Sequence, residues 1–178
     1  MKNSYRISGI KFFLLLFPAV CFSQKSMLQD EYGIKTLFIY NFTKYIEWPT
    51  TAMKNNFEID VMGESEILKP LEELSHSKKI NQKNIVIKII KPEDEITGEM
   101  IFISSSKSNQ LDAVLKNCKG KHILVVTETP NLAAKGSTIN FKVKDNKVRF
   151  ELNQSAAKNS GLKFSTQLVE LSIPVNAQ

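Results

Sequence analysis

The sequence predicts an α/β protein: a single domain with a mostly parallel, doubly wound sheet flanked by helices, and a C-terminal antiparallel hairpin on the sheet edge. Residues 100–103 and 123–126 are uninterrupted apolar runs, which are typical of strands covered on both faces, as in parallel sheets. A helical pattern from about residue 108 to residue 118 lies between them. This order of strand, helix and strand predicts a right-handed crossover between parallel neighbours.

An aromatic-rich helix is expected near the N-terminus, over residues 31–46. Its apolar residues recur at spacings of three and four. Glu47-Trp48-Pro49 ends the helix, because the residue before a proline avoids the helical region. The next expected elements are a strand at 57–62, a helix through residues 67–74 with Ser65 as a cap, and a strand at 85–90.

Alternating apolar and polar residues near the C-terminus predict the hairpin. Its strands, 137–144 and 147–152, would be joined by a tight turn at Asp145-Asn146. This turn places Lys142 opposite Arg149. The remaining expected elements are a short helix capped by Asn153 or Ser155 and ended by Gly161, and a last apolar segment at 162–173.

The N-terminus has the pattern of an export signal, so residues 1–23 are expected to be a signal peptide that precedes one domain over residues 24–178. Basic residues surround an apolar run at 12–20, which is roughly half the length needed to cross a bilayer. Cleavage after Ser23 would deliver the mature chain to the periplasm, without stable insertion into the membrane. The basic residues are Lys2, Arg6 and Lys11.

Lipoprotein processing at Cys21 is the alternative to ordinary cleavage. It requires a small residue directly before the cysteine and a leucine-like residue three positions before it. This sequence has Val20 and Pro18 at those places. The sequence therefore favours cleavage without lipidation and leaves lipidation of Cys21 open.

The net charge gives no reason to expect a nucleic-acid partner. The whole chain has 24 basic and 18 acidic residues, a formal charge of +6. Removal of the expected leader takes away three basic residues and no acidic ones, which leaves 21 minus 18, or +3. Nucleic-acid binding usually requires a clustered basic face and a higher charge.

The sequence lacks the motifs of catalytic, cofactor and metal sites. It has no glycine-rich phosphate loop and no nucleophile elbow. His76 and His122 lie too far apart for a pair of zinc ligands. Only Cys118 would remain after cleavage, which excludes an intramolecular disulfide, and its place in an apolar stripe predicts a buried thiol. We therefore expect neither an enzyme nor a bound cofactor or metal.

Two polar loops leave a small-ligand site open. Residues 93–95 are acidic and residues 104–108 are rich in serine, and both segments follow predicted strands. Loops after parallel strands are where ligands bind in open α/β sheets. The sequence nevertheless favours a solvated loop for the acidic cluster, because nothing apolar surrounds it, and helix capping for the serines.

The N-terminal helix has more apolar surface than one core needs. The excess would be a partner contact, unless the C-terminal segment encloses Ile39, Tyr40 and Ile46. The apolar residues of the N-terminal helix are Ile34, Leu37, Phe38, Phe42 and Tyr45 on one face, Ile39 and Ile46 beside them, and Tyr40 on the far side.

The outward face of the hairpin is basic. Lys142 opposite Arg149 is a like-charge pair that costs some stability. An acidic partner would offset that cost. Alternatively, the basic residues keep an edge strand from pairing with other molecules.

Two separated motifs resemble the signatures of YfiR-like proteins. The first runs from Lys35 to Pro49 as K-x-x-F-x-x-N-F-x-x-Y-I-E-W-P. The order of the elements between the motifs also matches, so the resemblance covers nearly the whole mature chain. The second motif consists of Ile139-Asn140-Phe141, K-V-R-F-E-L-N over 147–153, Ala156-Ala157 and Gly161-Leu162-Lys163.

The resemblance implies a non-enzymatic regulator in the periplasm. The best-known relative binds the periplasmic domain of an inner-membrane diguanylate cyclase and holds it inactive. An outer-membrane lipoprotein relieves this repression, and homodimers also occur in the family. Control of cyclic di-GMP and of biofilm formation would follow. That relative has disulfides, whereas one cysteine remains in this mature chain, so control by an intramolecular disulfide is not implied.

We therefore expect a protein that represses a membrane diguanylate cyclase or sensor kinase by binding its periplasmic part. An outer-membrane lipoprotein and a second copy of the chain are further expected partners. The alternative is a periplasmic protein that senses a small ligand. The residues expected to bind the partner are Ile39, Tyr40, Phe42, Ile46, Trp48, Arg149, Glu151, Leu168 and Leu171.

Overall fold

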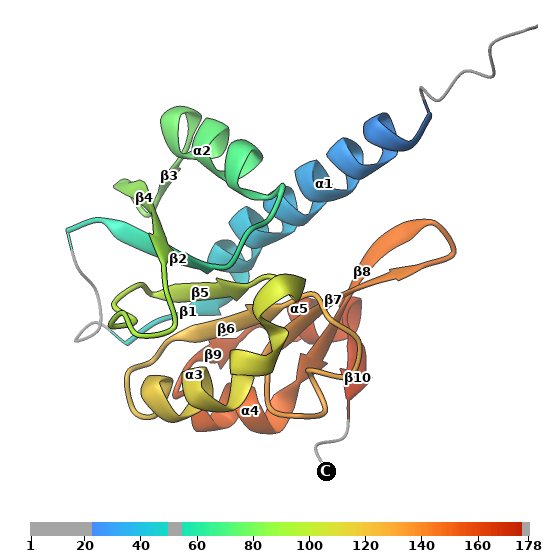
Figure 1. Ribbon diagram of the computed structural model, residues 1–178. Coiled ribbons are helices and arrows are strands. Elements are labelled where there is room, and N and C mark those ends of the chain that lie inside the picture. Colours follow the sequence, from blue (N-terminus) through green and yellow to red (C-terminus); the bar gives the residue numbers. More distant parts are fainter. Residues whose placement is uncertain (1–22, 50–54, 176–178) are drawn as a thin grey trace, which may run out of the picture.

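The computed structural model describes residues 23–49 and 55–175, and side-chain exposure within this part begins at residue 31 (Figure 1). Most of the expected leader, including Cys21, lies outside the described residues. In the described part, helices pack on a central sheet whose strands come from the whole length of the chain.

A mixed sheet of eight strands forms the centre of the protein, in the order β10-β8-β7-β6-β5-β2-β4-β3. The central strands β4, β2, β5, β6 and β7 are parallel, which confirms the expected parallel sheet. Antiparallel neighbours flank them, β3 beside β4 and β8 beside β7. The strands are β2 (Phe57–Met62), β3 (Lys79–Ile80), β4 (Lys83–Ile90), β5 (Met100–Ile103), β6 (Leu124–Thr127), β7 (Ile139–Lys144), β8 (Lys147–Asn153) and β10 (Ile173–Val175).

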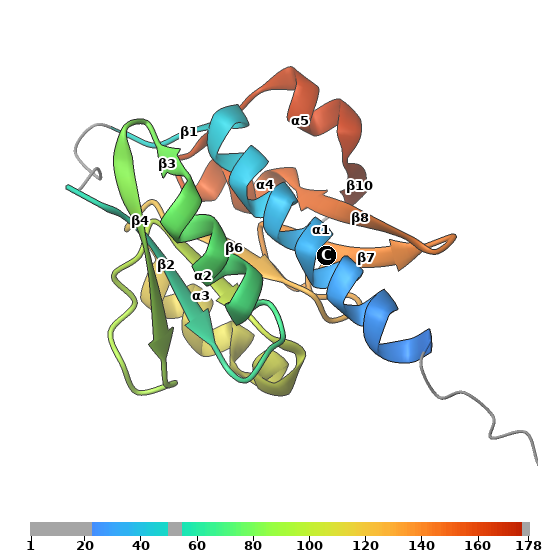
Figure 2. The same cartoon turned by 90° about the horizontal axis from the view of Figure 1, so that it is seen from above.

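Helices cover both faces of this sheet, as the doubly wound fold class requires. Figures 1 and 2 show α1 and α2 over one face and α3 on the other. The helices are α1 (Ser23–Tyr45), α2 (Leu68–Ser77), the 3₁₀ helix η2 (Ser105–Gln110), α3 (Leu111–Cys118), α4 (Gln154–Asn159) and α5 (Thr166–Leu171).

Alternation along the strands divides the apolar side chains between two cores. On β5, Met100 and Phe102 join the core that contains α1 and α2 residues, whereas Ile101 and Ile103 join the core that contains α3 residues. All four side chains are completely buried. A strand covered on both faces has no polar positions, which is why this segment is an uninterrupted apolar run.

Four phenylalanines attach α1 to the hairpin. The Phe42 ring centroid lies 5.9 Å from Phe141 and 5.0 Å from Phe150, and the Phe38 ring lies 6.2 and 5.6 Å from the same two rings. Aromatic pairs at such separations contribute about 0.5–1.5 kcal/mol each beyond their burial. Since Phe42 is only 1% exposed, this cluster fixes the helix on the sheet.

The structure corrects the expected orientation of α1. Ile39, Phe42 and Ile46 point into the core, whereas Ile34 and Leu37 are 42% and 57% exposed. Apolar residues surround most of this helix, so periodicity alone does not select the face that packs. The sequence left open whether Ile39 and Ile46 contact a partner or are enclosed within the protein. Both side chains are enclosed.

The hairpin extends beyond the sheet as a two-stranded ribbon (Figure 1). β6 pairs with β7 only at Ile139 and Asn140, and β10 pairs with β8 only at residues 151–153. Within the described chain, residues 141–150 therefore have no third strand beside them. The hairpin turn is the expected one, because Asp145 and Asn146 both have positive φ, as in tight hairpin turns.

The shortest elements were not predicted from the sequence. β1 (Ile46–Glu47) pairs with β9 (Lys163–Phe164) in a separate small sheet, and β3 and β10 are also very short. Two or three residues are too few to show a period. The cap of α4 was predicted correctly, since the Asn153 side chain accepts a hydrogen bond from the Ala156 amide at 2.9 Å.

Substitution of Phe42 tests the aromatic attachment of α1. We expect Phe42→Ala to lower the free energy of unfolding by about 3–5 kcal/mol, because it removes a buried ring and leaves a cavity. Leu37→Ala on the exposed side of the same helix should change it by no more than about 0.5 kcal/mol. Urea titration followed by circular dichroism measures both, and equal losses would contradict the orientation of α1.

Candidate functional site

The carboxyl edge of the parallel sheet is the place where ligands bind in many open α/β folds. Here β2 has β4 on one side and β5 on the other, so the direction of winding reverses between β2 and β5. Gly63 directly follows β2 with φ of +90°, and a Cβ there would lie 2.4 Å from the Ser104 Oγ. The two loops are therefore packed tightly together at this point.

An internal ion pair occupies this edge beside the two loops. The Lys35 Nζ of α1 lies 2.8 Å from the Glu128 Oε2 and 2.6 Å from the Glu31 Oε1. The other oxygen of Glu128 accepts a hydrogen bond from the Ser105 amide at 3.1 Å. The Lys35 and Glu128 side chains are 5% and 4% exposed. The amide that a bound anion would use is thus already bonded to a carboxylate of the protein.

The sequence suggested two explanations of the serine-rich residues 104–108, a ligand-binding loop and a helix cap, and neither is complete. Ser104 is the N-cap of η2, but its side chain makes no capping hydrogen bond and instead lies 2.7 Å from the Ser106 Oγ. Glu128, which sequence reasoning missed, bonds the helix terminus from the end of β6. The available signal was Lys35, a cation that stands among apolar residues of the N-terminal helix, four positions after Glu31.

The surroundings of Lys35 hold it in the charged form. Burial alone would lower the pKa of the ammonium, but hydrogen bonds to Glu128 and Glu31, together with their charges, outweigh burial and raise the pKa above its ordinary value. The ammonium also lies 4.4 Å from the centre of the Tyr32 ring. Lys35 therefore ties α1 to the carboxyl edge as a permanent cation.

A second candidate site is the apolar surface shared by α1 and the ribbon. We call it the α1–ribbon surface and define it by Ile34, Leu37, Phe38, Val143 and Val148. Ile34, Leu37 and Val143 are 42%, 57% and 52% exposed, and the other two are half-buried. Figures 1 and 2 show the N-terminal half of α1 and the ribbon tip extending toward the same side of the molecule.

Contacts under this surface hold its two halves together. Phe38 contacts Phe141 and Phe150, and the next pair toward the ribbon tip on the same face is Val143 opposite Val148. A cavity of about 310 Å³ lies between the two halves, lined by Glu31 and Lys35 of α1 and by several ribbon residues. The α1–ribbon surface therefore has a base of packed aromatic rings, and the cavity beside it is lined by one of its five residues, Val143.

Exposed cations lie on the face of the ribbon opposite to Val143 and Val148. Lys144, Lys147 and Arg149 are exposed, and Lys142 is opposite Arg149 in the register, as predicted. Glu151 accepts hydrogen bonds from the Lys142 Nζ at 3.1 Å and from the Asn140 side chain at 2.9 Å. The Glu151 carboxylate thus offsets part of the repulsion between Lys142 and Arg149. Lys144, Lys147 and Arg149 remain exposed to solvent.

The structure revises the set of residues expected to contact a partner. Ile39, Phe42, Ile46 and Leu168 are core residues with at most 4% exposure, so they present no surface. Arg149 is exposed and Leu171 is 66% exposed. The other three are largely engaged: Glu151 as described, Tyr40 by a hydrogen bond to the Lys79 carbonyl at 3.4 Å, and Trp48 by one to the Glu99 carbonyl at 3.1 Å.

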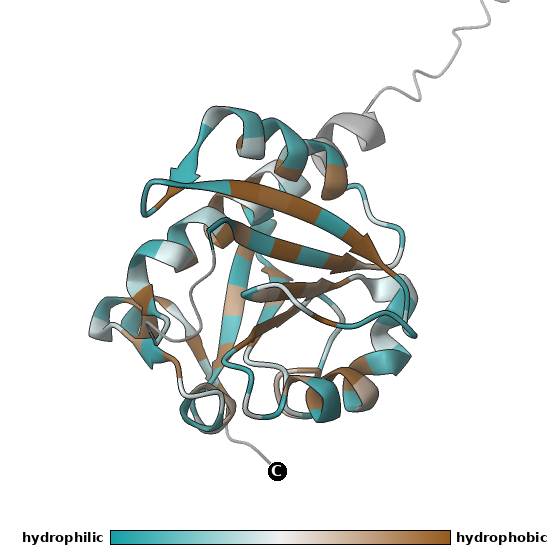
Figure 3. Cartoon of the chain, turned by 90° about the vertical axis from the view of Figure 1, so that its left-hand side faces the viewer, coloured by the Kyte–Doolittle hydropathy of each residue, from teal (hydrophilic) through white to brown (hydrophobic). Residues whose placement is uncertain are grey.

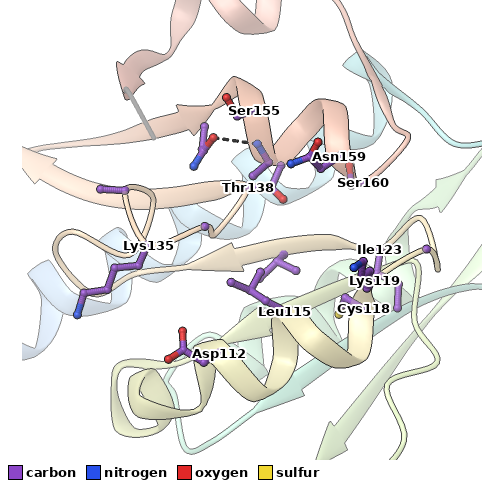
Figure 4. Close-up of a pocket in the computed structure, with 16 residues that line it drawn as sticks. Asp112, Leu115, Cys118, Lys119, Ile123, Lys135, Thr138, Ser155, Asn159 and Ser160 are labelled. Atoms are coloured by element: carbon purple, nitrogen blue, oxygen red, sulfur yellow. Dashed lines mark hydrogen bonds between the residues drawn. The ribbon is translucent and has the colours of Figure 1, made fainter. Parts of the chain in front are cut away.

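A third feature is an open groove of about 890 Å³ between α3 and α4 (Figure 4). Leu115 and Ile123 supply apolar walls, and Lys119 and Asn159 supply polar groups. The groove lies toward the amino ends of β6 and β7, whereas the sequence suggested ligand loops at the carboxyl ends. Cys118 lines it, but burial raises the pKa of its thiol to about 12, which keeps it protonated and unreactive at neutral pH.

Among the residues that the structure describes, no three His, Cys, Asp or Glu side chains gather where they could hold a metal ion. In the same part of the chain, none of the helices combines the length and the apolar character needed to cross a membrane.

A family model described as YfiR/HmsC-like matches residues 32–173. The matched span contains both sequence motifs and all five residues of the α1–ribbon surface. No curated protein matches the chain.

The ion pair at the carboxyl edge can be tested by a double-mutant cycle. We expect Lys35→Met to lower the free energy of unfolding by about 3–5 kcal/mol, because it leaves the Glu128 carboxylate buried without its counter-ion. The Glu128→Gln variant keeps an acceptor for Ser105, and the double variant should lose less than the sum of the two single losses. Urea titrations of the four proteins measure this coupling.

The pH dependence of this coupling follows from the raised pKa of Lys35. When folding raises the pKa of a lysine, the resulting stabilisation is complete at pH values below the pKa of that lysine in the unfolded chain. It is lost as the pH rises through the pKa of the lysine in the folded protein. The coupling should therefore be constant from about pH 7 to pH 10 and fall at higher pH. Zero coupling at pH 7 would mean that Lys35 and Glu128 contribute independently.

Proposed function

The chain belongs to the YfiR/HmsC-like family, and from this premise we propose that it is an exported regulator that represses a membrane signalling protein by binding its periplasmic part. The family is periplasmic and regulatory rather than catalytic, in agreement with the resemblance of the two sequence motifs. The partner that we propose is an inner-membrane diguanylate cyclase or sensor kinase, with an outer-membrane lipoprotein as the protein that relieves repression.

The α1–ribbon surface is the observation that carries this proposal. Its three exposed apolar residues, Ile34, Leu37 and Val143, lie on elements that the buried phenylalanines hold in place. A rigid apolar patch with a polar border is the usual anatomy of a protein-binding site, because little entropy is lost when the partner binds. The ion pair at the carboxyl edge, in contrast, already engages the Ser105 amide that an anionic ligand would use.

The charges around the patch indicate the chemistry of the partner. Lys144, Lys147 and Arg149 are exposed on the face of the ribbon opposite to Val143, so a partner that encloses the ribbon would be apolar where it meets Val143 and acidic where it reaches the other face. Such charges mainly speed the encounter and select the partner, and their effect decreases with salt. We also propose Leu171 as a secondary contact, because it is a large apolar side chain with 66% exposure.

Repression would follow from selective binding to one state of the partner. If the regulator binds the inactive conformation more tightly than the active one, the equilibrium shifts by the difference in binding free energy. A shift from mostly active to mostly inactive requires about 10⁴-fold selectivity. A regulator with this mechanism needs no catalytic group. Sequestration of the α1–ribbon surface by a third protein would reverse the effect.

Substitution of Leu37 tests the proposed binding surface. We expect Leu37→Asp and Val143→Asp each to weaken capture of the partner's periplasmic domain by about tenfold to a hundredfold, because each places a charge in the apolar centre. Both side chains are more than half exposed, so folding should be unaffected. Titration of the monovalent soluble domain by biolayer interferometry measures the dissociation constants.

Ile89→Asp is a matched control, because Ile89 is 66% exposed and lies on β4, far from β7 and β8 in the strand order. It introduces the same charge without touching the α1–ribbon surface, so the monovalent dissociation constant should not change. Unchanged binding by both Leu37→Asp and Val143→Asp would reject this surface as the binding site.

The α3–α4 groove supports a second candidate function, the sensing of a small periplasmic ligand. Its volume is sufficient for a drug-sized molecule. Ala156 lines the groove and is half-buried, so Ala156→Trp should fill it. A ligand with a concentration of 100 times its dissociation constant would stabilise the wild type by about 2.7 kcal/mol, and stabilise this variant much less. Thermal-shift screening of metabolites measures this, and an absence of any response would reject the sensor hypothesis.

A further inference from the structure

The side of α3 that faces the α3–α4 groove carries a charge at each end. Asp112, Leu115 and Lys119 all line the groove, and their spacing of three and four residues places them in one row along the helix. Seven residues of helix rise by roughly 10 Å, which separates the two charges. Figure 4 shows Asp112 and Lys119 toward opposite ends of α3, with Leu115 between them. This wall therefore offers an acid, an apolar side chain and a base in turn.

The charged groups of the groove are not used within the protein. Asp112 and Lys119 are exposed, and so is Lys135, which lines the groove at the same end as Asp112 (Figure 4). Within the part of the chain that the structure describes, none of these three side chains forms an ion pair. A ligand that satisfies all of them would carry one cationic group and two anionic groups.

The opposite wall of the groove offers hydrogen-bonding groups. Ser155 and Asn159 are exposed polar residues of α4, and Thr138, which is 2% exposed, lines the groove beside them. The Thr138 amide donates to the Val125 carbonyl at 3.1 Å. Its hydroxyl makes no hydrogen bond to the described residues, so it is available to a ligand. Donors and acceptors thus face the apolar middle of α3 across the groove.

The floor of the groove is apolar but not aromatic. It contains Ile123 and Val125, and Figure 3 shows that hydrophobic residues predominate along the central strands, whereas the flanking helices also carry hydrophilic ones. None of the described residues that line the groove is aromatic. Since proteins usually hold nucleobases by stacking them on aromatic side chains, the groove does not suit a nucleotide, although it has two cations.

We infer that the groove binds a short anionic peptide, with its ammonium group at Asp112 and its C-terminal carboxylate at Lys119. An extended chain of three residues spans roughly 10 Å, which matches the separation of these two side chains. An acidic side chain on the first residue would pair with Lys135, and the peptide groups would bond the hydroxyl and amide groups of the opposite wall. This inference rests on the sensor function proposed for the groove and names the class of ligand.

A peptide in the groove leaves the α1–ribbon surface accessible. The helix α3 covers the face of the sheet opposite to α1 (Figures 1 and 2), and none of the five residues that define the α1–ribbon surface lines the groove. Peptide binding and capture of the protein partner can therefore be measured separately on the same purified chain.

Titration of the tripeptide Glu-Ala-Ala into the ¹⁵N-labelled chain, followed by NMR, tests this inference. We expect saturable shifts of the Leu115, Gly136 and Asn159 amide signals. Amidation of the peptide's carboxylate should weaken binding about fivefold, because it removes one exposed ion pair. Lys119→Gln should weaken the free acid by the same factor and leave the amidated peptide unchanged. Lys116→Gln is the matched control, since this exposed lysine of α3 does not line the groove, and it should change neither dissociation constant.

Two results would overturn the inference. One is the absence of saturable shifts with Glu-Ala-Ala, and the other is an effect of Lys119→Gln that is equal for the free and the amidated peptide. If metabolite screening then finds a different ligand that Ala156→Trp excludes, the peptide class is wrong and the sensor function remains. If neither the peptide nor any metabolite binds, both proposals for the groove are rejected.

Discussion

The packing of α1 on the β7–β8 hairpin is the contact on which the rest of the structure depends. The Phe42 ring packs on both Phe141 and Phe150, which follow it by about a hundred positions in the chain. The contact closes the core on one face of the sheet and holds the base of the ribbon. Because this side of α1 is buried, the opposite side, with Ile34 and Leu37, faces solvent. Core packing and the proposed binding surface are thus two consequences of one helix orientation.

The carboxyl edge shows how a common α/β architecture loses its usual ligand site. In many such folds the helix terminus after a central strand binds an anion. Here Glu128 bonds the Ser105 amide and Lys35 neutralises Glu128. Removing these charges from water costs free energy that the pair only partly returns. The arrangement therefore serves to position α1 against the sheet edge, which agrees with a regulator that acts through its surface.

The two ends of the sheet differ in how their outer strands are arranged. At one end the strands continue past the sheet as a ribbon with basic side chains, which discourage pairing with other strands. At the other end β4 pairs with β3 only at Lys83 and Asn84, and the Ile89 side chain is exposed.

The sequence alone determined the family, the parallel sheet, most long elements and the hairpin turn, because apolar runs, periodicity and turn residues are local signals. It also predicted the buried Cys118 thiol. Only the tertiary structure decided which side of α1 is buried, since a helix that is apolar on most sides packs according to what surrounds it. The same holds for Lys35 and Glu128, which meet across 93 positions, and for the free edge of β4. Such features arise from contacts between distant segments, and no short stretch of sequence contains the information that brings those segments together.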